Sequence, residues 1–193
     1  MRIISGEFKG RRITAPKKLP VRPTTDMAKE SLFNILNNRY YIDEISVLDL
    51  FAGTGNLSYE FASRGCEQIT AVDQDYGCIK FINETAESFG MTINTIKSDV
   101  FKFLEHAQGS HTVIFADPPY ELPKEEFAKI AQLIFENSLL KEEGILVIEH
   151  SKRTDLSDLQ HYVKSKSYGG NSFSFFEIAT EEEEEEEEEE ETD

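Results

Sequence analysis

The sequence is poor in cysteine, and the two cysteines present do not form a recognisable site. Cys66 and Cys78 lie in unlike contexts without metal-ligand spacing, so neither a disulfide framework nor a zinc centre is expected. The chain also lacks an apolar run near the roughly 18 residues that cross a bilayer, and Met1–Gly6 lacks the apolar core of a secretory signal. We therefore expect a cytoplasmic protein that binds neither a metal nor a membrane.

The length of 193 residues suits one α/β domain with a single core. From residue 46 onward, short apolar runs alternate with helical patterns, which is typical of a parallel sheet covered on both faces. The expected strands are 47–50, 69–72, 92–96, 112–116 and 145–148, and the expected helices lie near 57–64, 76–89, 99–106 and 124–138. A closing antiparallel hairpin, 162–163 with 172–178, is expected across Gly169 and Gly170.

The N-terminal residues 1–24 are expected to form a small β-hairpin-like arm. Two short β-prone pieces, 2–5 and 12–15, are punctuated by glycines. The arm is too short for a core of its own, so residues 25–178 are expected to form the main domain. Residues 179–193, which are mostly glutamate, are expected to be a disordered acidic tail.

A helix is expected to begin directly after the arm. Thr24 or Thr25 can cap its first turn with a side-chain hydroxyl. Its apolar residues, which we expect to pack on the sheet, are Met27, Leu32, Ile35 and Leu36.

Charge is distributed very unevenly along the chain. The net charge is −17, but residues 181–193 carry twelve acids, and without them 20 basic residues face 25 acidic ones, a net charge of −5. The arm has the opposite sign, with a net charge of +6. Such a segment is often merely solvated surface, but it is also where a phosphate backbone would dock. The residues predicted to bind nucleic acid are Lys9, Arg11, Arg12, Lys17, Lys18 and Arg22.

The first strong motif is a glycine turn that follows the strand at 47–50. It reads Asp49-Leu-Phe51-Ala-Gly53-Thr-Gly55, and its glycines allow the backbone to approach a ligand at the carboxyl edge of a doubly wound sheet. Nicotinamide and flavin folds share such a turn, but their pattern needs a third glycine where Ser58 stands. The motif is instead similar to the first motif of S-adenosylmethionine-dependent methyltransferases. Asp49, Phe51, Gly53 and Gly55 are therefore predicted to belong to the cofactor site.

Acidic residues also follow the next two strands. Asp73 lies 20 residues beyond Gly53, where a carboxylate can hold a ribose diol through paired hydrogen bonds; a solvated loop acid is the alternative. Asp99 is expected to accept a hydrogen bond from the amino group of the cofactor's adenine, while Val100 packs on the adenine ring. A helix N-cap role for Ser98 or Asp99 is equally open, and the two roles can coexist.

The decisive motif is Asp117-Pro118-Pro119-Tyr120, directly after the strand at 112–116. Two successive prolines remove two backbone donors, so the segment offers carbonyls and side chains that accept hydrogen bonds from an amino group. The Asp117 carboxylate and the Pro118 carbonyl can accept hydrogen bonds from the two N–H groups of an exocyclic amine. The nitrogen can then pyramidalise, so that its lone pair is no longer delocalised into the ring and can attack a sulfonium methyl group. Tyr120 would stack on the base. An ordinary turn is the alternative, but the position after the glycine turn and the acid favours catalysis.

The chain up to about residue 178 resembles the bacterial small-subunit rRNA guanine-N2 methyltransferases, the family named for guanine 966 of 16S rRNA. The stretches that carry the resemblance are Met1–Gly6 with Lys9–Arg12, Arg22–Asp26 with Glu30–Asn34, Asp49–Gly55 with Ser63–Gly65, and Asp117–Tyr120.

The resemblance implies a Rossmann-like α/β fold with a mostly parallel seven-stranded sheet, and S-adenosyl-L-methionine as cofactor. It implies that the enzyme methylates the exocyclic N2 amine of a guanine in 16S rRNA. We expect this rRNA to belong to an assembling small subunit, with naked rRNA as the open alternative, and we expect the protein to be a monomer. The arm and Arg22 should then grip rRNA, and Thr24 and Thr25 should approach the methionine end of the cofactor.

Two departures from the family pattern stand beside this resemblance. Met27 and Lys29 stand where arginine is frequent, and the stretch 56–59 reads Asn-Leu-Ser-Tyr rather than Ala-Leu-Gly-Leu. The alternatives to an rRNA enzyme are a DNA adenine-N6 or cytosine-N4 methyltransferase, which usually carries a longer target-recognition segment, and an inactive rRNA-binding assembly factor with the same fold.

Overall fold

The computed structural model describes residues 1–19 and 24–179. Arg22 and the acidic stretch from residue 180 onward lie outside this range, so the expectations for them are not addressed by the structure. The helices are α1 (Asp26–Asn37), α2 (Asn56–Ser63), α3 (Tyr76–Phe89), α4 (Val100–His106) and α5 (Lys124–Glu136). The strands are β1 (Ser46–Leu50), β2 (Gln68–Asp73), β3 (Asn94–Lys97), β4 (His111–Ala116), β5 (Leu140–Ser151), β6 (Tyr162–Tyr168) and β7 (Asn171–Phe176).

The strands form one sheet in the order β3-β2-β1-β4-β5-β7-β6. The first five are parallel, while β7 pairs antiparallel with both β5 and β6. This confirms the predicted α/β fold with its seven strands and its closing hairpin. The chain leaves β1 toward β2 and later returns on the other side as β4, so the strand order reverses at β1. In doubly wound sheets, ligands bind outside the carboxyl ends of the strands at such a reversal.

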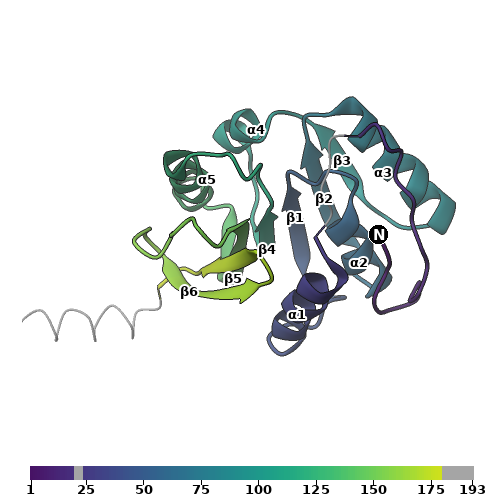
Figure 1. Cartoon of the computed structure of the whole chain (residues 1–193), viewed down its shortest axis with the longest axis horizontal. Helices are drawn as coiled ribbons and strands as arrows, with labels where there is room; N and C mark the ends of the chain where they lie inside the picture. Colours follow the sequence, from purple (N-terminus) through teal and green to yellow (C-terminus); the bar gives the residue numbers. More distant parts are fainter. Residues whose placement is uncertain (20–23, 180–193) are drawn as a thin grey trace, which may run out of the picture.

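Two apolar layers hold the helices against the sheet (Figure 1). On one face, α1 and α2 pack on inward side chains such as Val47 and Phe115. On the other face, α4 and α5 pack on the alternate residues, including Leu48 and Ile114. Because successive residues of a strand point to opposite faces, β1 is buried along its whole length.

The N-terminal arm pairs with itself through a single antiparallel bridge between Arg2 and Arg12. Ile3 and Ile13 of the arm are buried in a cluster with the α2 residue Tyr59 and with residues of β2 and α3. Figure 1 shows this segment running beside α2 and α3. The arm therefore obtains its apolar contacts from the main domain. The basic side chains that its described residues expose are Arg2, Lys9, Arg11, Arg12, Lys17 and Lys18.

Helix α1 forms as expected, but its apolar face was partly mispredicted. Thr25 caps the helix by accepting from the Ala28 amide at 3.2 Å. Met27 is 66% exposed, whereas Lys29 is only 1% exposed. The buried stripe runs through positions 28, 29, 32, 33 and 36, and Met27 lies outside it.

Both cysteines are buried thiols, as expected. Across residues 1–19 and 24–179, no helix is both long enough and apolar enough to span a membrane. Over the same residues, no cluster of three or more histidine, cysteine or carboxylate side chains is arranged to hold a metal ion.

Candidate active site

A cavity of about 700 Å³ lies at the carboxyl ends of β1, β2 and β4, at the point where the strand order reverses. It brings together most of the predicted site residues from five separate stretches of the chain. Those that line it are Thr24, Asp49, Phe51, Gly53, Asp73, Asp99, Val100, Asp117, Pro118, Pro119 and Tyr120. Thr25 and Gly55 do not line it; Thr25 caps α1, and Gly55 shapes the turn behind the cavity.

The glycine turn has the conformation that its sequence predicts. Gly53 and Gly55 have φ values of 54° and 81°, in the left-handed region that side chains disfavour. A Cβ atom on Gly55 would lie 2.9 Å from Ile82 Cγ1 and 3.0 Å from the Tyr59 ring. Phe51 also has a positive φ of 57°, a strained conformation of the kind that proteins keep at binding sites. Gly55 is therefore needed for packing, while Phe51 and Gly53 face the ligand space.

Asp49 is a buried acid at the wall of the cavity. It is 3% exposed, and the Ser58 hydroxyl donates to its Oδ2 at 2.5 Å. Burial raises the pKa of Asp49 to about 7, although the hydrogen bond from Ser58 opposes the shift. The serine that stands in place of a third glycine thus holds this carboxyl group.

Asp73 supports the glycine turn as well as lining the cavity. Its Oδ2 accepts from the Gly53 amide, and its Oδ1 accepts from the Asp75 amide, both at 2.8 Å. Asp75 itself caps α3 by accepting from the Cys78 amide at 2.9 Å. Each carboxylate oxygen can accept more than one hydrogen bond, so Asp73 retains the capacity to bind a diol.

Asp99 has the N-cap role that the sequence left open. Its Oδ1 accepts from the Lys102 amide at 3.0 Å at the start of α4. It also lines the cavity beside Val100, which is 3% exposed. The structure therefore places an acceptor and an apolar surface together at the end of β3.

The Asp-Pro-Pro-Tyr segment is fixed at both of its ends. The Asp117 amide donates to the Leu50 carbonyl of β1 at 3.3 Å, and the Leu122 amide donates to the Pro119 carbonyl at 3.0 Å. The segment therefore has a fixed position at the end of β4, where it lines the same cavity as the glycine turn.

Glu149 is a buried acid behind this segment that the sequence analysis did not identify. It is 1% exposed, at the end of β5. It accepts from the Thr24 hydroxyl at 2.9 Å and from the Asn171 side-chain amide at 2.7 Å, and the Tyr120 hydroxyl lies 3.4 Å away. A charged residue directly after the apolar run 145–148 was the available signal; Asn171 gave none.

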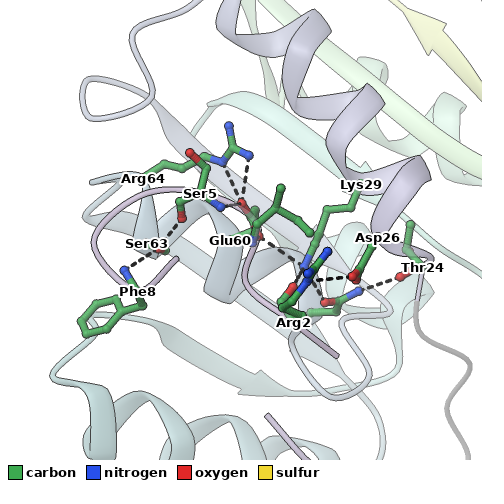
Figure 2. Close-up of polar contacts among 11 residues, drawn as sticks. Arg2, Ser5, Phe8, Thr24, Asp26, Lys29, Glu60, Ser63 and Arg64 are labelled. Carbon is green, nitrogen blue, oxygen red and sulfur yellow. Dashed lines mark hydrogen bonds and ion pairs between the residues drawn. The ribbon is translucent and has the colours of Figure 1, made fainter. Parts of the chain in front are cut away.

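A third buried acid, Glu60, anchors the N-terminal arm to α2 (Figure 2). Glu60 is 0% exposed and accepts from the backbone amides of Ile4 and Ser5 at 2.8 and 3.0 Å. It also pairs with Arg64 at 2.9 Å and with Lys29 at 3.2 Å. Burial lowers the pKa of Lys29, an effect that the negative charge of Glu60 opposes.

Lys29 extends this anchor toward the cavity. Its ammonium donates to the Arg2 carbonyl at 2.6 Å and to Asn56 Oδ1 at 3.0 Å. The Asn56 side-chain amide donates in turn to the Thr24 carbonyl at 3.0 Å. Lys29 and Asn56, two departures from the family pattern, thus contact each other directly and hold a cavity residue.

Gly6 is the point of closest contact between the arm and α2. A Cβ atom there would lie 1.8 Å from the Ser63 carbonyl oxygen, so only glycine fits. The Ser63 hydroxyl donates to the Ser5 carbonyl at 2.6 Å and accepts from the Phe8 amide at 3.0 Å (Figure 2). Two of the stretches that carried the family resemblance, Met1–Gly6 and Ser63–Gly65, therefore meet in the structure.

Comparison with known proteins agrees with this architecture. The model of the family described as Conserved hypothetical protein 95 matches residues 1–177. The chain is 36% identical over 163 residues to the Bacillus subtilis protein named Putative rRNA methyltransferase YlbH, which covers 82% of this chain and 86% of that protein. It is 31% identical over 150 residues to Ribosomal RNA small subunit methyltransferase D of Escherichia coli K12, covering 77% and 74% of the two chains.

A solved structure, the putative methyltransferase yhhF from Escherichia coli, has the same fold. Its TM-score is 0.81 at 24% identity, covering 93% of this chain and 99% of that one. The family match and the two curated relatives confirm the resemblance seen in the sequence, and this chain therefore belongs to the Conserved hypothetical protein 95 family.

Proposed function

We propose that this protein transfers the methyl group of S-adenosyl-L-methionine to the exocyclic N2 amine of a guanine in 16S rRNA. One observation carries the proposal. One cavity is lined both by the glycine turn with its acids and by Asp117–Tyr120. A methyl donor and an amino acceptor can therefore meet in one space. The names of the two curated relatives support ribosomal RNA as the substrate.

The residues around the glycine turn fit the chemistry of the cofactor. Asp73 would hold the ribose hydroxyls, and Asp99 with Val100 would contact the adenine. Asp49 and Thr24 would face the methionine part. When bound, the cofactor supplies an electrophilic methyl group on a sulfonium sulfur.

At the acceptor end, Asp117 and Pro118 would align the amine. The Asp117 carboxylate and the Pro118 carbonyl would accept hydrogen bonds from the two N–H groups of the amine. Tyr120 would stack on the base and hold its amine in line with the methyl group. The gain comes from alignment and electrostatics, which together supply several kcal/mol of barrier reduction in enzymes of many classes.

The arm would hold the RNA backbone. Lys9, Arg11, Arg12, Lys17 and Lys18 are all exposed, and Arg22 is assigned with them from the sequence alone. We further propose that the substrate is rRNA in an assembling small subunit and that the enzyme acts as a cytoplasmic monomer.

The direct test is methyl transfer in vitro followed by mass mapping. Purified protein with labelled cofactor should methylate small-subunit rRNA or 30S particles, and fragment masses should place the methyl group on a guanine N2. Methylation of duplex DNA instead of rRNA would replace the proposal with the DNA-enzyme alternative, whereas transfer to an adenine or a cytosine of rRNA would refute guanine as the target.

Replacing Asp73 with alanine should weaken cofactor binding. The loss of paired hydrogen bonds to a diol costs about 2 to 4 kcal/mol, which calorimetry reads as a rise in Kd of roughly 30-fold to 1000-fold. Asp155→Ala, which removes an exposed carboxylate outside the cavity, is the matched control and should bind normally. Unaltered affinity in Asp73→Ala would transfer the ribose role to another residue, such as Asp75.

Deleting residues 181–193 should tighten RNA binding at low salt and change little at high salt. The eleven glutamates at 181–191 would compete with RNA for the arm at an effective concentration of about millimolar. Screening near 1 M salt, where the Debye length is about 3 Å, would remove that competition.

Filter binding of the full and shortened chains across a salt series measures this effect. Substituting Arg11, Arg12, Lys17 and Lys18 with alanine should flatten the salt slope by about 0.7 to 0.9 per lost phosphate contact. An unchanged low-salt affinity after truncation would show that the acidic stretch does not mask the arm.

A further inference from the structure

The buried carboxylate of Glu149 connects three segments that are far apart in the chain. Thr24 precedes α1, Tyr120 follows β4, and Asn171 begins β7. Thr24 and Tyr120 line the cavity, whereas Glu149 and Asn171 do not. Glu149 therefore contacts the cavity wall from behind.

The two carboxylate oxygens contact different parts of that wall. Oε2 accepts from the Thr24 hydroxyl at 2.9 Å. Oε1 accepts from Asn171 Nδ2 at 2.7 Å and lies 3.4 Å from the Tyr120 hydroxyl. Asn171 Nδ2 also lies 2.6 Å from that hydroxyl, so Tyr120 is held by both partners at the far end of its ring.

Burying a carboxylate this completely costs free energy of folding unless its oxygens are hydrogen-bonded. Its backbone lies in the paired part of β5, where Glu149 faces Phe173 of β7. Glu149 is therefore a rigid point, whereas Tyr120 belongs to a loop. Hydrogen bonds at the phenol oxygen restrict rotation and tilt of the Tyr120 ring, which a loop residue would otherwise retain.

We propose that Glu149, with Asn171, is a positioning residue that sets the plane of the Tyr120 ring and so aligns the target base for methyl transfer. The inference rests on the proposed function of this site. It predicts that Glu149 acts on the reaction through the Tyr120 hydroxyl rather than by touching the base. A displacement of about 1 Å at a reacting centre can cost roughly 100-fold in rate.

The first test is a double-mutant cycle measured as kcat, KM for rRNA and Kd for the cofactor. We expect Glu149→Leu to lower kcat by about 100-fold at saturating cofactor. Glu149 also holds Thr24, so the cofactor Kd is measured separately to ensure saturation in every variant. Tyr120→Phe, which keeps the ring and loses the hydroxyl, should lower kcat in the same direction. The double variant should be no slower than Glu149→Leu alone, because both changes remove one shared contact.

Two further variants make the cycle decisive. Glu149→Gln keeps an acceptor oxygen and the side-chain volume, so it should recover most of the lost kcat. If Glu149→Leu does not fold, the cycle is run with Asn171→Ala, which removes the other partner of the Tyr120 hydroxyl. Glu125→Leu, at an exposed site on α5, is the control and should match the parent. Multiplicative losses in the cycle, or a wild-type kcat in Glu149→Leu, would overturn the proposal.

A second readout avoids chemistry altogether. Once the methylated guanine is mapped, RNA lacking only that base should bind the parent protein about 5-fold to 150-fold more weakly than intact RNA, because it loses the stacking of the base on an aromatic ring. In Glu149→Leu this difference should shrink while binding of the base-free RNA is unchanged. An undiminished difference would refute the role of Glu149. Failure of the parent protein to methylate rRNA would instead refute the proposed function.

Discussion

Asp117→Ala should abolish methyl transfer while the protein still binds its cofactor. The carboxylate acts on the target amine, so its loss removes the acceptor of a hydrogen bond from the amine N–H group in the transition state. Removing a single well-placed group of this kind costs about 100-fold to 1000-fold in kcat. Cofactor affinity, measured by calorimetry, should stay within about threefold of the parent value.

The outcome is best judged against two other variants. Asp117→Asn keeps one acceptor oxygen at the same position and should retain more activity than the alanine variant. Asp155→Ala removes an exposed carboxylate away from the cavity and should leave the rate unchanged. A folded Asp117→Ala protein that no longer binds the cofactor would place this carboxylate in the cofactor site and remove it from the role proposed.

Glu60→Gln should be among the most destabilising single changes in this protein. Glu60 accepts from two backbone amides, from Arg64 and from the buried Lys29. An amide would turn an NH₂ group toward donors and leave the Lys29 ammonium without its full counter-charge. Breaking a buried pair in this way costs about 3 to 5 kcal/mol, a large share of the roughly 5 to 15 kcal/mol by which domains are stable.

Urea unfolding measures this cost, and α3 provides the matched control. There, Lys80 and Glu84 form an i,i+4 pair at 3.7 Å whose side chains are 59% and 64% exposed. Glu84→Gln should change stability by less than about 1 kcal/mol. A similar small change in Glu60→Gln would mean that the arm is held mainly by the packing of Ile3 and Ile13.

The parts of the site that could be predicted are those that depend on local sequence. The glycine turn, Asp73 and Asp117 each follow an apolar strand, and parallel strands bring their carboxyl ends to one edge. Their convergence on one cavity therefore followed from the strand pattern. The same reasoning predicted the closing hairpin, because two β-prone runs lay on either side of Gly169–Gly170.

The parts that could not be predicted depend on contacts between distant residues. Thr24 and Glu149 are 125 residues apart, and no period in the sequence links them. Lys29 lies among apolar residues of α1, where a pattern of hydrophobic residues favours Met27 for the buried face. What buries Lys29 is the acid at position 60 of another helix, which a single helix cannot reveal.

The position of β7 has a consequence for how the C-terminal region tolerates change. Although β7 is the last strand of the described residues, it lies between β5 and β6. Within the described residues β6 pairs only with β7, so loss of Asn171–Phe176 would detach two strands from the sheet. It would also turn the twelve-residue β5 into an open edge with unpaired backbone groups, the kind of edge that recruits other chains into aggregates. A frameshift or proteolytic cut at this point should therefore produce an insoluble protein rather than a slightly shortened enzyme.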